Sequence, residues 1–433
     1  MLDREAIRQK LAQAHSLRIT GRVTSVTGLA LRFTMPGVRV GDVVHIIRRG
    51  DPLMAEVVGF LRGEAVAMPL GPLVGVGPDD EVETTGAPFQ VRASQELLGR
   101  VVDGLGRPID GRGAITKGTF VSADAPPPAA LSRPPIASML TTGVRAIDGL
   151  LTLGRGQRVG LFAGSGVGKS TLLGAIARGA EADVVVVALV GERGREVVEF
   201  LDHSLGVDGK KRSIVVVATS DVTALERMRA AEVATAYAEY FRDQGASVLL
   251  LVDSITRYAR AQREVGLAAG EPPARRGYPP SVFAKLPRLL ERAGQGARGA
   301  ITAIYTVLVE GSDMEEPIAD EVRGTLDGHI VLDRSIAARG RYPAIDVAVS
   351  LSRVMDAVTT PEQRNAAHRL RSLAGLYEEK RDLIGVGAYV KGHDRQLDEA
   401  VAKMPTIERY VQQSATDRVP FAQSLTELLE VMR

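Results

Sequence analysis

The chain contains 433 residues, more than a single hydrophobic core usually supports, so two or three domains are expected. Lys and Arg number 54 against 52 Asp and Glu, and the net charge of +2 argues against a protein that coats nucleic acid or an acidic membrane. The sequence has no cysteine, which excludes disulfides, thiolate metal sites and cysteine nucleophiles and fits a reducing cytosol. Few His and no HExxH motif disfavour a zinc hydrolase.

Residues 1–15 are predicted to form a short amphipathic helix. Leu2, Ala6, Ile7 and Leu11 fall on one face, and acidic and basic side chains surround them. These interleaved charges, with no apolar stretch behind them, exclude a secretory signal. A helix this short needs a surface to dock on, which is either its own domain or a partner protein.

Residues 16–85 are predicted to form a small β-barrel. Short segments of strand length alternate with glycines, as closely spaced antiparallel turns require. The expected strands are Arg18–Val26, Leu29–Phe33, Val43–Arg48, Ala55–Phe60 and Glu64–Met68. A barrel that binds nucleic acid needs aromatic stacking platforms, and the only aromatic residues before residue 90 are Phe33, Phe60 and Phe89. We therefore expect no nucleic-acid partner.

Residues 86–360 predict an α/β domain with a parallel sheet covered by helices on both faces. Apolar runs of strand length, rich in β-branched residues, alternate with helical segments. The expected strands are Leu98–Asp103, Arg158–Ala163, Val184–Val190, Ile214–Thr219, Val248–Asp253 and Ala300–Val309. A proline-rich segment at residues 125–135 is expected to cross this domain as an extended strap.

Residues 361–433 are predicted to form a helical domain. The apolar side chains that recur there at helical spacing are Leu370, Leu373, Leu376, Tyr377, Leu383 and Ile384. Barrel, α/β domain and helical end together account for the whole length beyond residue 15.

A glycine-rich loop between a predicted strand and a predicted helix carries the strongest chemical signal. Its glycines allow backbone N–H groups to converge on phosphate oxygens, and the helix N-terminus adds its dipole. Lys169 is predicted to reach the β- and γ-phosphates, and the Ser170 hydroxyl to bind Mg²⁺. Ala163 replaces the first glycine of the strict motif, at a position that needs only a small residue. The predicted nucleotide-binding residues of the loop are Gly164, Ser165, Gly166, Val167, Gly168, Lys169, Ser170 and Thr171.

Two further buried strands are predicted to end in carboxylates that face the same crevice. Asp253 follows an apolar run at the carboxyl end of a parallel strand, where it is expected to organise the Mg²⁺ shell. Glu192 ends another such run and is positioned to activate an attacking water as a general base. Together with Lys169, these residues predict Mg²⁺-dependent hydrolysis of ATP.

Five segments taken together closely resemble the type III secretion and flagellar export ATPases, which are relatives of the catalytic subunit of the rotary ATP synthase. They are residues 141–171, VGERGREVVEF at 190–200, LLLVDSITRYARAQREVGLAAGEPP at 249–273, GYPPSVFAKLPRLLERAG at 277–294, and DGHIVLDR with YPAIDVAVSLSRVM within 327–355. The resemblance implies a homohexameric ring built from an N-terminal β-barrel, a RecA-like P-loop ATPase core and a C-terminal helical domain.

The resemblance also implies roles for single residues. Arg193 supports the catalytic Glu192, and Arg257 lies near the phosphates. Arg353 matches the arginine finger that reaches into the next subunit, and Tyr342 matches a tyrosine that stacks on adenine. An arginine supplied in trans stabilises charge on the transferred phosphoryl group. Because base, metal ligand and finger all occur in one chain, identical subunits suffice for the ring.

Partners and location follow from the resemblance alone. The loop Gly266–Tyr278 is expected to line the pore of the ring and to meet a central stalk protein or moving substrate. The N-terminal helix is expected to bind a stator or regulator, and the helices after Glu362 to receive chaperone–effector complexes. The chain is expected in the cytoplasm, peripherally associated with the export apparatus at the inner membrane.

Alternative functions stay open at this point. The segment 311–323 favours an injectisome over a flagellar export apparatus. The export-type segments disfavour the catalytic subunit of a rotary ATP synthase, and the lack of aromatic residues in the barrel disfavours an RNA-translocating motor with the same core. A pseudo-ATPase that only binds nucleotide is disfavoured because Lys169, Glu192, Asp253 and Arg353 are all present.

Overall fold

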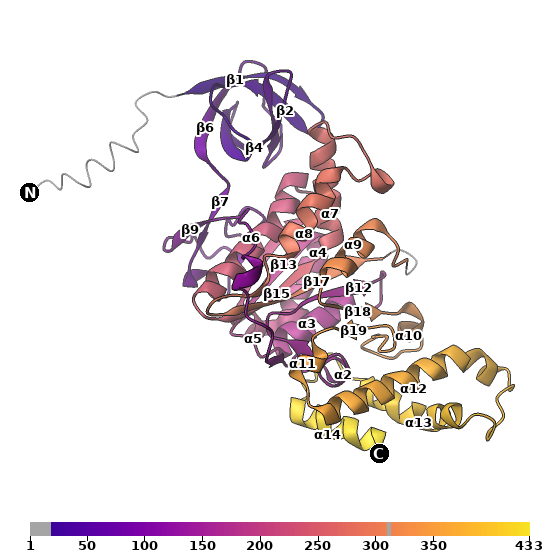
Figure 1. Cartoon of the computed structure of the whole chain (residues 1–433). Helices are drawn as coiled ribbons and strands as arrows, with labels where there is room; N and C mark the ends of the chain where they lie inside the picture. The colour runs from indigo at the N-terminus through magenta and orange to yellow at the C-terminus, as the bar shows by residue number, and fades with distance from the viewer. Residues whose placement is uncertain (1–18, 310–312) are drawn as a thin grey trace, which may run out of the picture.

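The computed structural model describes residues 19–309 and 313–433, and the chain falls into three successive parts (Figure 1). A β-barrel lies at one end, a layered α/β body in the middle, and a group of helices at the other end. The helix predicted over residues 1–15 lies outside the described residues. Within the described ranges, no helix is long and apolar enough to cross a membrane.

Six antiparallel strands close the N-terminal barrel in the order β1-β2-β5-β4-β3-β6. They are β1 (Thr20–Thr27), β2 (Ala30–Thr34), β3 (Asp42–Ile47), β4 (Leu53–Leu61), β5 (Glu64–Pro69) and β6 (Glu81–Pro88). The interior is filled by inward-facing apolar side chains such as Leu31, Phe33 and Val44. The predicted barrel is confirmed, and β6, which the sequence pattern did not predict, closes it by pairing with both β1 and β3.

A nine-stranded sheet forms the centre of the body. Its main path runs β19-β18-β12-β17-β15-β13-β14-β8, and β16 pairs with β17 beside that path. The strands are β8 (Val101–Asp103), β12 (Arg158–Ala163), β13 (Val184–Glu192), β14 (Ser213–Thr219), β15 (Ser247–Asp253), β16 (Gly294–Gln295), β17 (Ala300–Leu308), β18 (Gly328–Leu332) and β19 (Leu351–Ser352). Every pair is parallel except those made by the two-residue strands β16 and β19. The parallel core predicted from the apolar runs is confirmed.

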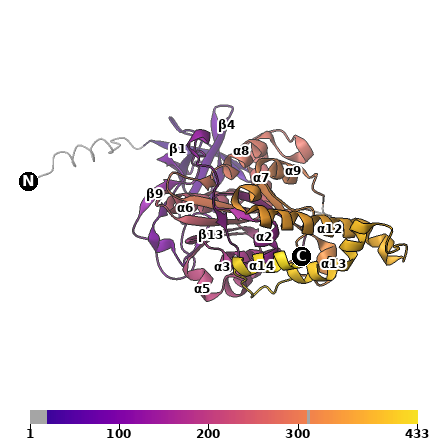
Figure 2. The ribbon, with the colours of Figure 1, turned by 60° about the horizontal axis from the view of Figure 1, so that its bottom comes forward.

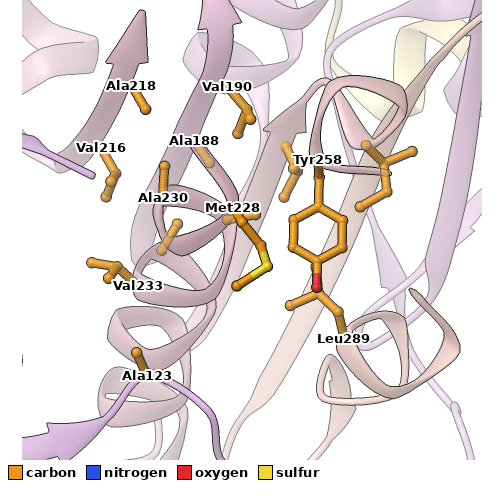
Figure 3. Close-up of a cluster of buried hydrophobic side chains, with 14 of the residues drawn as sticks. Ala123, Ala188, Val190, Val216, Ala218, Met228, Ala230, Val233, Tyr258 and Leu289 are labelled. Carbon is orange, nitrogen blue, oxygen red and sulfur yellow. The ribbon is translucent and has the colours of Figure 1, made fainter. Parts of the chain in front are cut away.

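Helices cover both faces of this sheet, which explains why its strands are apolar throughout. Alternate residues of β13 enter two different clusters: Val186, Ala188 and Val190 on one face and Val185, Val187 and Leu189 on the other. On the first face α6 (Ala224–Asp243) supplies Met228, which lies among Ala188, Val216 and Tyr258 (Figure 3). On the second face α3 (Lys169–Gly179) supplies Leu172, Leu173 and Ile176.

The remaining elements of the body are short or lie outside the sheet. The helices are α2 (Arg145–Leu150), α4 (Gly194–Glu199), a π-helical turn (Phe200–Leu205), α5 (Gly206–Lys211), α7 (Ile255–Ala268), α8 (Pro280–Leu290), α9 (Pro317–Thr325), α10 (Arg334–Ala338) and α11 (Met355–Val358). Two small sheets pair β7 (Gln90–Ala93) with β9 (Thr119–Ser122) and β10 (Met139–Leu140) with β11 (Leu153–Gly154).

Three helices, α12 (Pro361–Gly385), α13 (Arg395–Val411) and α14 (Phe421–Met432), form the C-terminal end. Leu370 and Leu373 of α12 are buried in the same cluster as the second face of the sheet, so these helices pack directly on the body. The far end of α12 leaves the body, and Leu383 is half exposed there (Figure 2). The predicted helical domain is confirmed.

Candidate active site

The glycine-rich loop lies between the end of β12 and the start of α3. Gly166 and Gly168 have φ angles of 78° and 86°, in the left-handed region that favours glycine. Between them, Val167 is buried at 2% exposure and fixes the loop to the apolar cluster below. The loop backbone thus wraps a space in front of the α3 N-terminus, where N–H groups attract phosphate oxygens.

The sheet brings both predicted carboxylates to this loop. Parallel strands β13 and β15 pair Leu189 with Asp253, so the side chain of Glu192 lies just beyond the same edge. The ammonium group of Lys169 forms an ion pair with Asp253 and lies 3.5 Å from Oε1 of Glu192. Thr306 lies on β17, between β12 and β15 in the sheet, and donates a hydrogen bond of 2.7 Å to Oδ1 of Asp253. Lysine and two buried acids therefore converge at the glycine-rich loop.

The surroundings of Glu192 favour its protonated form. Burial raises the pKa of this carboxyl to about 7, and a hydrogen bond shared with Glu196 and the charge of Asp253 act in the same direction. The cations of Lys169 and Arg257 oppose these effects but do not cancel them. A carboxyl that titrates near neutral pH suits a general base.

Glu196 is a residue of the site that the sequence did not single out. It lies on the first turn of α4, lines the phosphate side of the cavity and shares a hydrogen bond with Glu192. The same hydrogen bond lowers the pKa of Glu196, so Glu196 is the charged member of the pair. Only its four-residue spacing from Glu192, one turn into a helix, could have indicated it.

The two predicted arginines beside Glu192 differ in their contacts. Arg257 lies with its guanidinium 3.0 Å from Oε2 of Glu192 and also donates a hydrogen bond to the carbonyl of Gly191. The side chain of Arg193 is 81% exposed and pairs with Glu196 at 3.3 Å rather than with Glu192. Any support that Arg193 gives to Glu192 therefore passes through Glu196.

Two adjoining cavities meet at the glycine-rich loop. The first, of about 530 Å³, is lined by Lys169, Ser170, Glu192 and Arg257 and matches the phosphate side. Arg260 on α7 and Arg334 on α10 also line it, and the sequence analysis singled out neither.

The second cavity, of about 610 Å³, matches the base side of a nucleotide site. It shares Gly166, Gly168 and Thr171 with the phosphate cavity, and Tyr342 forms one of its walls. The segment 412–415, between α13 and α14, also lines it. Gln413 ties this segment to Tyr342 by a 2.9 Å backbone hydrogen bond, so the helical domain completes the cavity.

Arg353 is the predicted residue that the fold keeps out of this site. It follows β19 at the edge of the sheet, is exposed, and lines neither cavity. Its side chain makes no hydrogen bond or ion pair within residues 19–309 and 313–433. Its backbone N–H donates to the carbonyl of Asp327 at 3.0 Å, which fixes the base of the side chain.

The donors at the phosphate side fit Mg²⁺. The Ser170 hydroxyl is exposed at the start of α3, and Asp253 lies at the same edge of the sheet. Oε1 of Glu192 is buried and accepts no hydrogen bond, so it has capacity for a further partner. Mg²⁺ is commonly held by one or two protein carboxylates together with phosphates and water, and Ser170 and Asp253 supply oxygens of that kind.

Two adjacent family models match most of the body and the helical end. Residues 143–352 match the nucleotide-binding domain of the ATP synthase alpha/beta family. Residues 359–430 match the C-terminal domain of the type III secretion system ATPase EscN.

Similar proteins of known name align over nearly the whole chain. The type 3 secretion system ATPase of Xanthomonas euvesicatoria is 51% identical over 425 residues, which are 98% of this chain and 96% of that protein. The flagellum-specific ATP synthase of Bacillus subtilis is 50% identical over 412 residues, 94% of each chain. The assembled ATPase EscN of the enteropathogenic E. coli type III secretion system has a TM-score of 0.91 at 46% identity, covering 95% of this chain and 100% of that one.

Proposed function

The chain belongs to the family of type III secretion and flagellar export ATPases, and we propose that it hydrolyses Mg²⁺-ATP as a homohexamer to energise protein export. The observation that carries the proposal is the convergence of Lys169, Glu192 and Asp253 on the glycine-rich loop. Loop, cation and buried acids are the parts that phosphoryl transfer to water requires.

Each residue has a separate task in this scheme. The loop backbone and Lys169 hold the β- and γ-phosphates, and Tyr342 stacks on the base. Glu192, deprotonated, accepts a proton from the water that attacks the γ-phosphorus. Arg257, through its contact with Glu192, keeps that carboxylate at the phosphate side of the cavity.

Mg²⁺, held through Ser170 and Asp253, would neutralise charge on the β- and γ-phosphates. The ammonium group of Lys169 has three N–H donors, so it can bind phosphate oxygens beside the carboxylates of Asp253 and Glu192.

The exposed Arg353 supports the hexamer. An arginine that lines no cavity of its own chain, and has no partner in the described ranges, is available to a neighbouring subunit. Supplied in trans, such a residue stabilises the charge on the transferred phosphoryl group. The assembled state of the EscN structure is a second support.

Further partners are proposed from the relatives. EscN forms a complex with its central stalk protein EscO, and this chain is similar to EscN in that complex at a TM-score of 0.88. We assign the corresponding stalk contact to the segment Gly266–Tyr278, which begins in the last turn of α7, at the pore. The segment 1–15 would bind a stator or regulator, and the C-terminal helices would receive chaperone–effector complexes, at the cytoplasmic face of the inner membrane.

Flagellar export is the second candidate. The Bacillus subtilis relative, a flagellum-specific ATP synthase, is 50% identical, within one percentage point of the secretion ATPase from Xanthomonas euvesicatoria. Overall identity therefore does not separate the two uses, and the injectisome assignment rests on the segment 311–323. Complementation of an injectisome mutant and a flagellar mutant by the same gene distinguishes them.

A pair of lysine variants tests the ATPase itself. Lys169→Ala should lower turnover by at least about a hundredfold, since it removes a preorganised cation from the transferred phosphate. Lys210→Ala is the matched control, because Lys210 pairs with Asp202 on the surface, away from the glycine-rich loop. Normal ATP turnover by purified Lys169→Ala protein would refute the assignment of the site.

A further inference from the structure

The backbone just before Arg353 is held by side chains from two different parts of the molecule. From the sheet, Nε2 of His329 on β18 lies 2.9 Å from the carbonyl oxygen of Val349. From the C-terminal helices, Nε of Arg371 donates a 2.8 Å hydrogen bond to the carbonyl of Val347, and Nη2 donates a second one to the carbonyl of Ser350. Three of the four carbonyls at 347–350 therefore have a side-chain partner.

Arg371 is the contact that crosses from one domain to another. It lies on α12, half buried, while the carbonyls that it binds belong to the segment leading into β19. Its planar guanidinium can donate to two acceptors in a fixed geometry, which a lysine cannot reproduce. The two hydrogen bonds of Arg371 therefore fix the orientation of the segment 347–350 relative to α12 as well as its distance from that helix.

A second set of contacts anchors α12 beside the same strand. Gln363, on the first turn of α12, donates to Oγ1 of Thr152 at 2.9 Å. The carbonyl of Thr152 accepts a 2.9 Å hydrogen bond from Ser352, the residue immediately before Arg353. Helix α12 is thus connected to the backbone on which Arg353 stands through both Arg371 and Gln363.

The other end of α12 is free of the body. The helix has 25 residues, about 37 Å at 1.5 Å per residue, and its far end and the following turn expose Leu383, Val386 and Val390. Figure 2 shows α12 and α13 projecting together from the rest of the molecule. The helix that carries Arg371 therefore joins this projecting end to the segment before Arg353.

We propose that Arg371 is a positioning residue that holds the segment 347–350 so that Arg353 reaches the active site of the neighbouring subunit. The placement of Arg353 then depends on the position of α12. The C-terminal helices therefore control the rate of ATP hydrolysis in the active site of the neighbouring subunit. This inference rests on the proposed role of Arg353 in trans. A misplacement of a catalytic group by about 1 Å can cost a hundredfold in rate.

The test compares Arg371→Ala with Arg369→Ala in the full-length protein. Arg369 lies on the same helix and donates to the carbonyl of Met432 and to Glu399, so these partners of its side chain belong to the C-terminal end. In assembled rings, Arg371→Ala should lower kcat by about 10- to 100-fold with KM for ATP changed less than about threefold. Arg369→Ala should leave both parameters close to those of the parent protein.

Two measurements separate positioning from loss of structure. Mass photometry of the ring and binding of a fluorescent ATP analogue should match between Arg371→Ala and the parent protein. Arg371→Lys, which can reach one carbonyl but not both, should give an intermediate kcat, and this variant serves if the alanine protein does not fold.

The double variant Arg371→Ala/Arg353→Ala decides the mechanism. If Arg371 acts through Arg353, the double variant should be no slower than Arg353→Ala alone, because the positioned group is already absent. A kcat of Arg371→Ala equal to that of the parent, or fully multiplicative losses in the double variant, would overturn the proposal. A normal kcat of Arg353→Ala would overturn the proposed role of Arg353 in trans. This result differs from one in which only Arg371→Ala keeps a normal kcat, which would overturn the positioning role of Arg371 alone.

Discussion

Arg257 and Arg353, both predicted to act on the phosphates, have opposite surroundings. Arg257 lies 3.0 Å from Glu192 and binds the carbonyl of Gly191, inside the cavity of its own chain. Arg353 stands exposed at the edge of the sheet, and no side-chain partner for it occurs among the described residues. Under the proposed function, one subunit contains the residues that bind ATP, and the neighbouring subunit supplies Arg353 for rapid hydrolysis.

The largest effect is expected from the general base. Glu192→Gln keeps the shape of the side chain but cannot accept a proton, so kcat should fall by about a thousandfold. Binding of ATP should persist, because the loop and Lys169 are unchanged. Isothermal titration with ATP checks the retained binding, and steady-state turnover checks the fall in kcat. A variant that hydrolyses ATP at the normal rate would contradict the role of Glu192.

Arg353→Ala should lower kcat of the ring by about a thousandfold while the affinity of the isolated subunit for ATP stays the same. The comparison with Arg257 is sharpened by measuring nucleotide affinity at protein concentrations where the subunit is monomeric. A weaker affinity of monomeric Arg353→Ala would place this residue in its own site.

The pH dependence should report the titration of the buried carboxyl group of Glu192. Because burial raises the pKa of Glu192 to about 7, this group is protonated below that pH and cannot act as a base. In the free enzyme, kcat/KM should therefore fall about tenfold per pH unit as the pH drops below 7.

Glu196→Gln tests the origin of that pKa. Its carboxylate accepts the hydrogen bond that favours protonated Glu192, so its removal should shift the acidic limb of the kcat/KM profile to lower pH. The maximal value of kcat/KM is measured separately from the position of this limb. An unshifted limb would show that Glu196 does not set the pKa of Glu192.

The smallest effect is expected at the base cavity. Tyr342→Ala removes an aromatic wall, and since stacking on a base contributes about 1–3 kcal/mol, KM for ATP should rise roughly tenfold with kcat little changed. Tyr342→Phe keeps the ring and is the control. A kcat effect without a KM effect would argue against a binding role for this residue.

The parts of the site that sequence could predict are those encoded by local segments. The glycine-rich loop, Asp253 and Glu192 each end a continuous apolar strand, and parallel pairing necessarily brings such ends to one edge. The parallel sheet could be predicted for the same reason, because strands buried on both faces are continuous runs of apolar, β-branched residues.

The rest depended on contacts between distant segments. Nothing in the sequence around residues 412–415 indicates that they close the base cavity, because the connection is a backbone hydrogen bond to Tyr342. Arg371 likewise binds carbonyl groups, which every residue carries, so no residue pattern marks the pair. Strand β6 was missed because its polar and apolar residues do not alternate clearly enough to predict a strand.

The most direct test of hydrolysis shared between subunits mixes two inactive proteins. Lys169→Ala subunits have an intact Arg353 but a defective loop, and Arg353→Ala subunits have an intact loop but lack the finger. If Arg353 acts in trans, rings assembled from an equal mixture should hydrolyse ATP well above the sum of the two separate preparations. A mixture that forms rings yet shows only that sum would contradict the shared site.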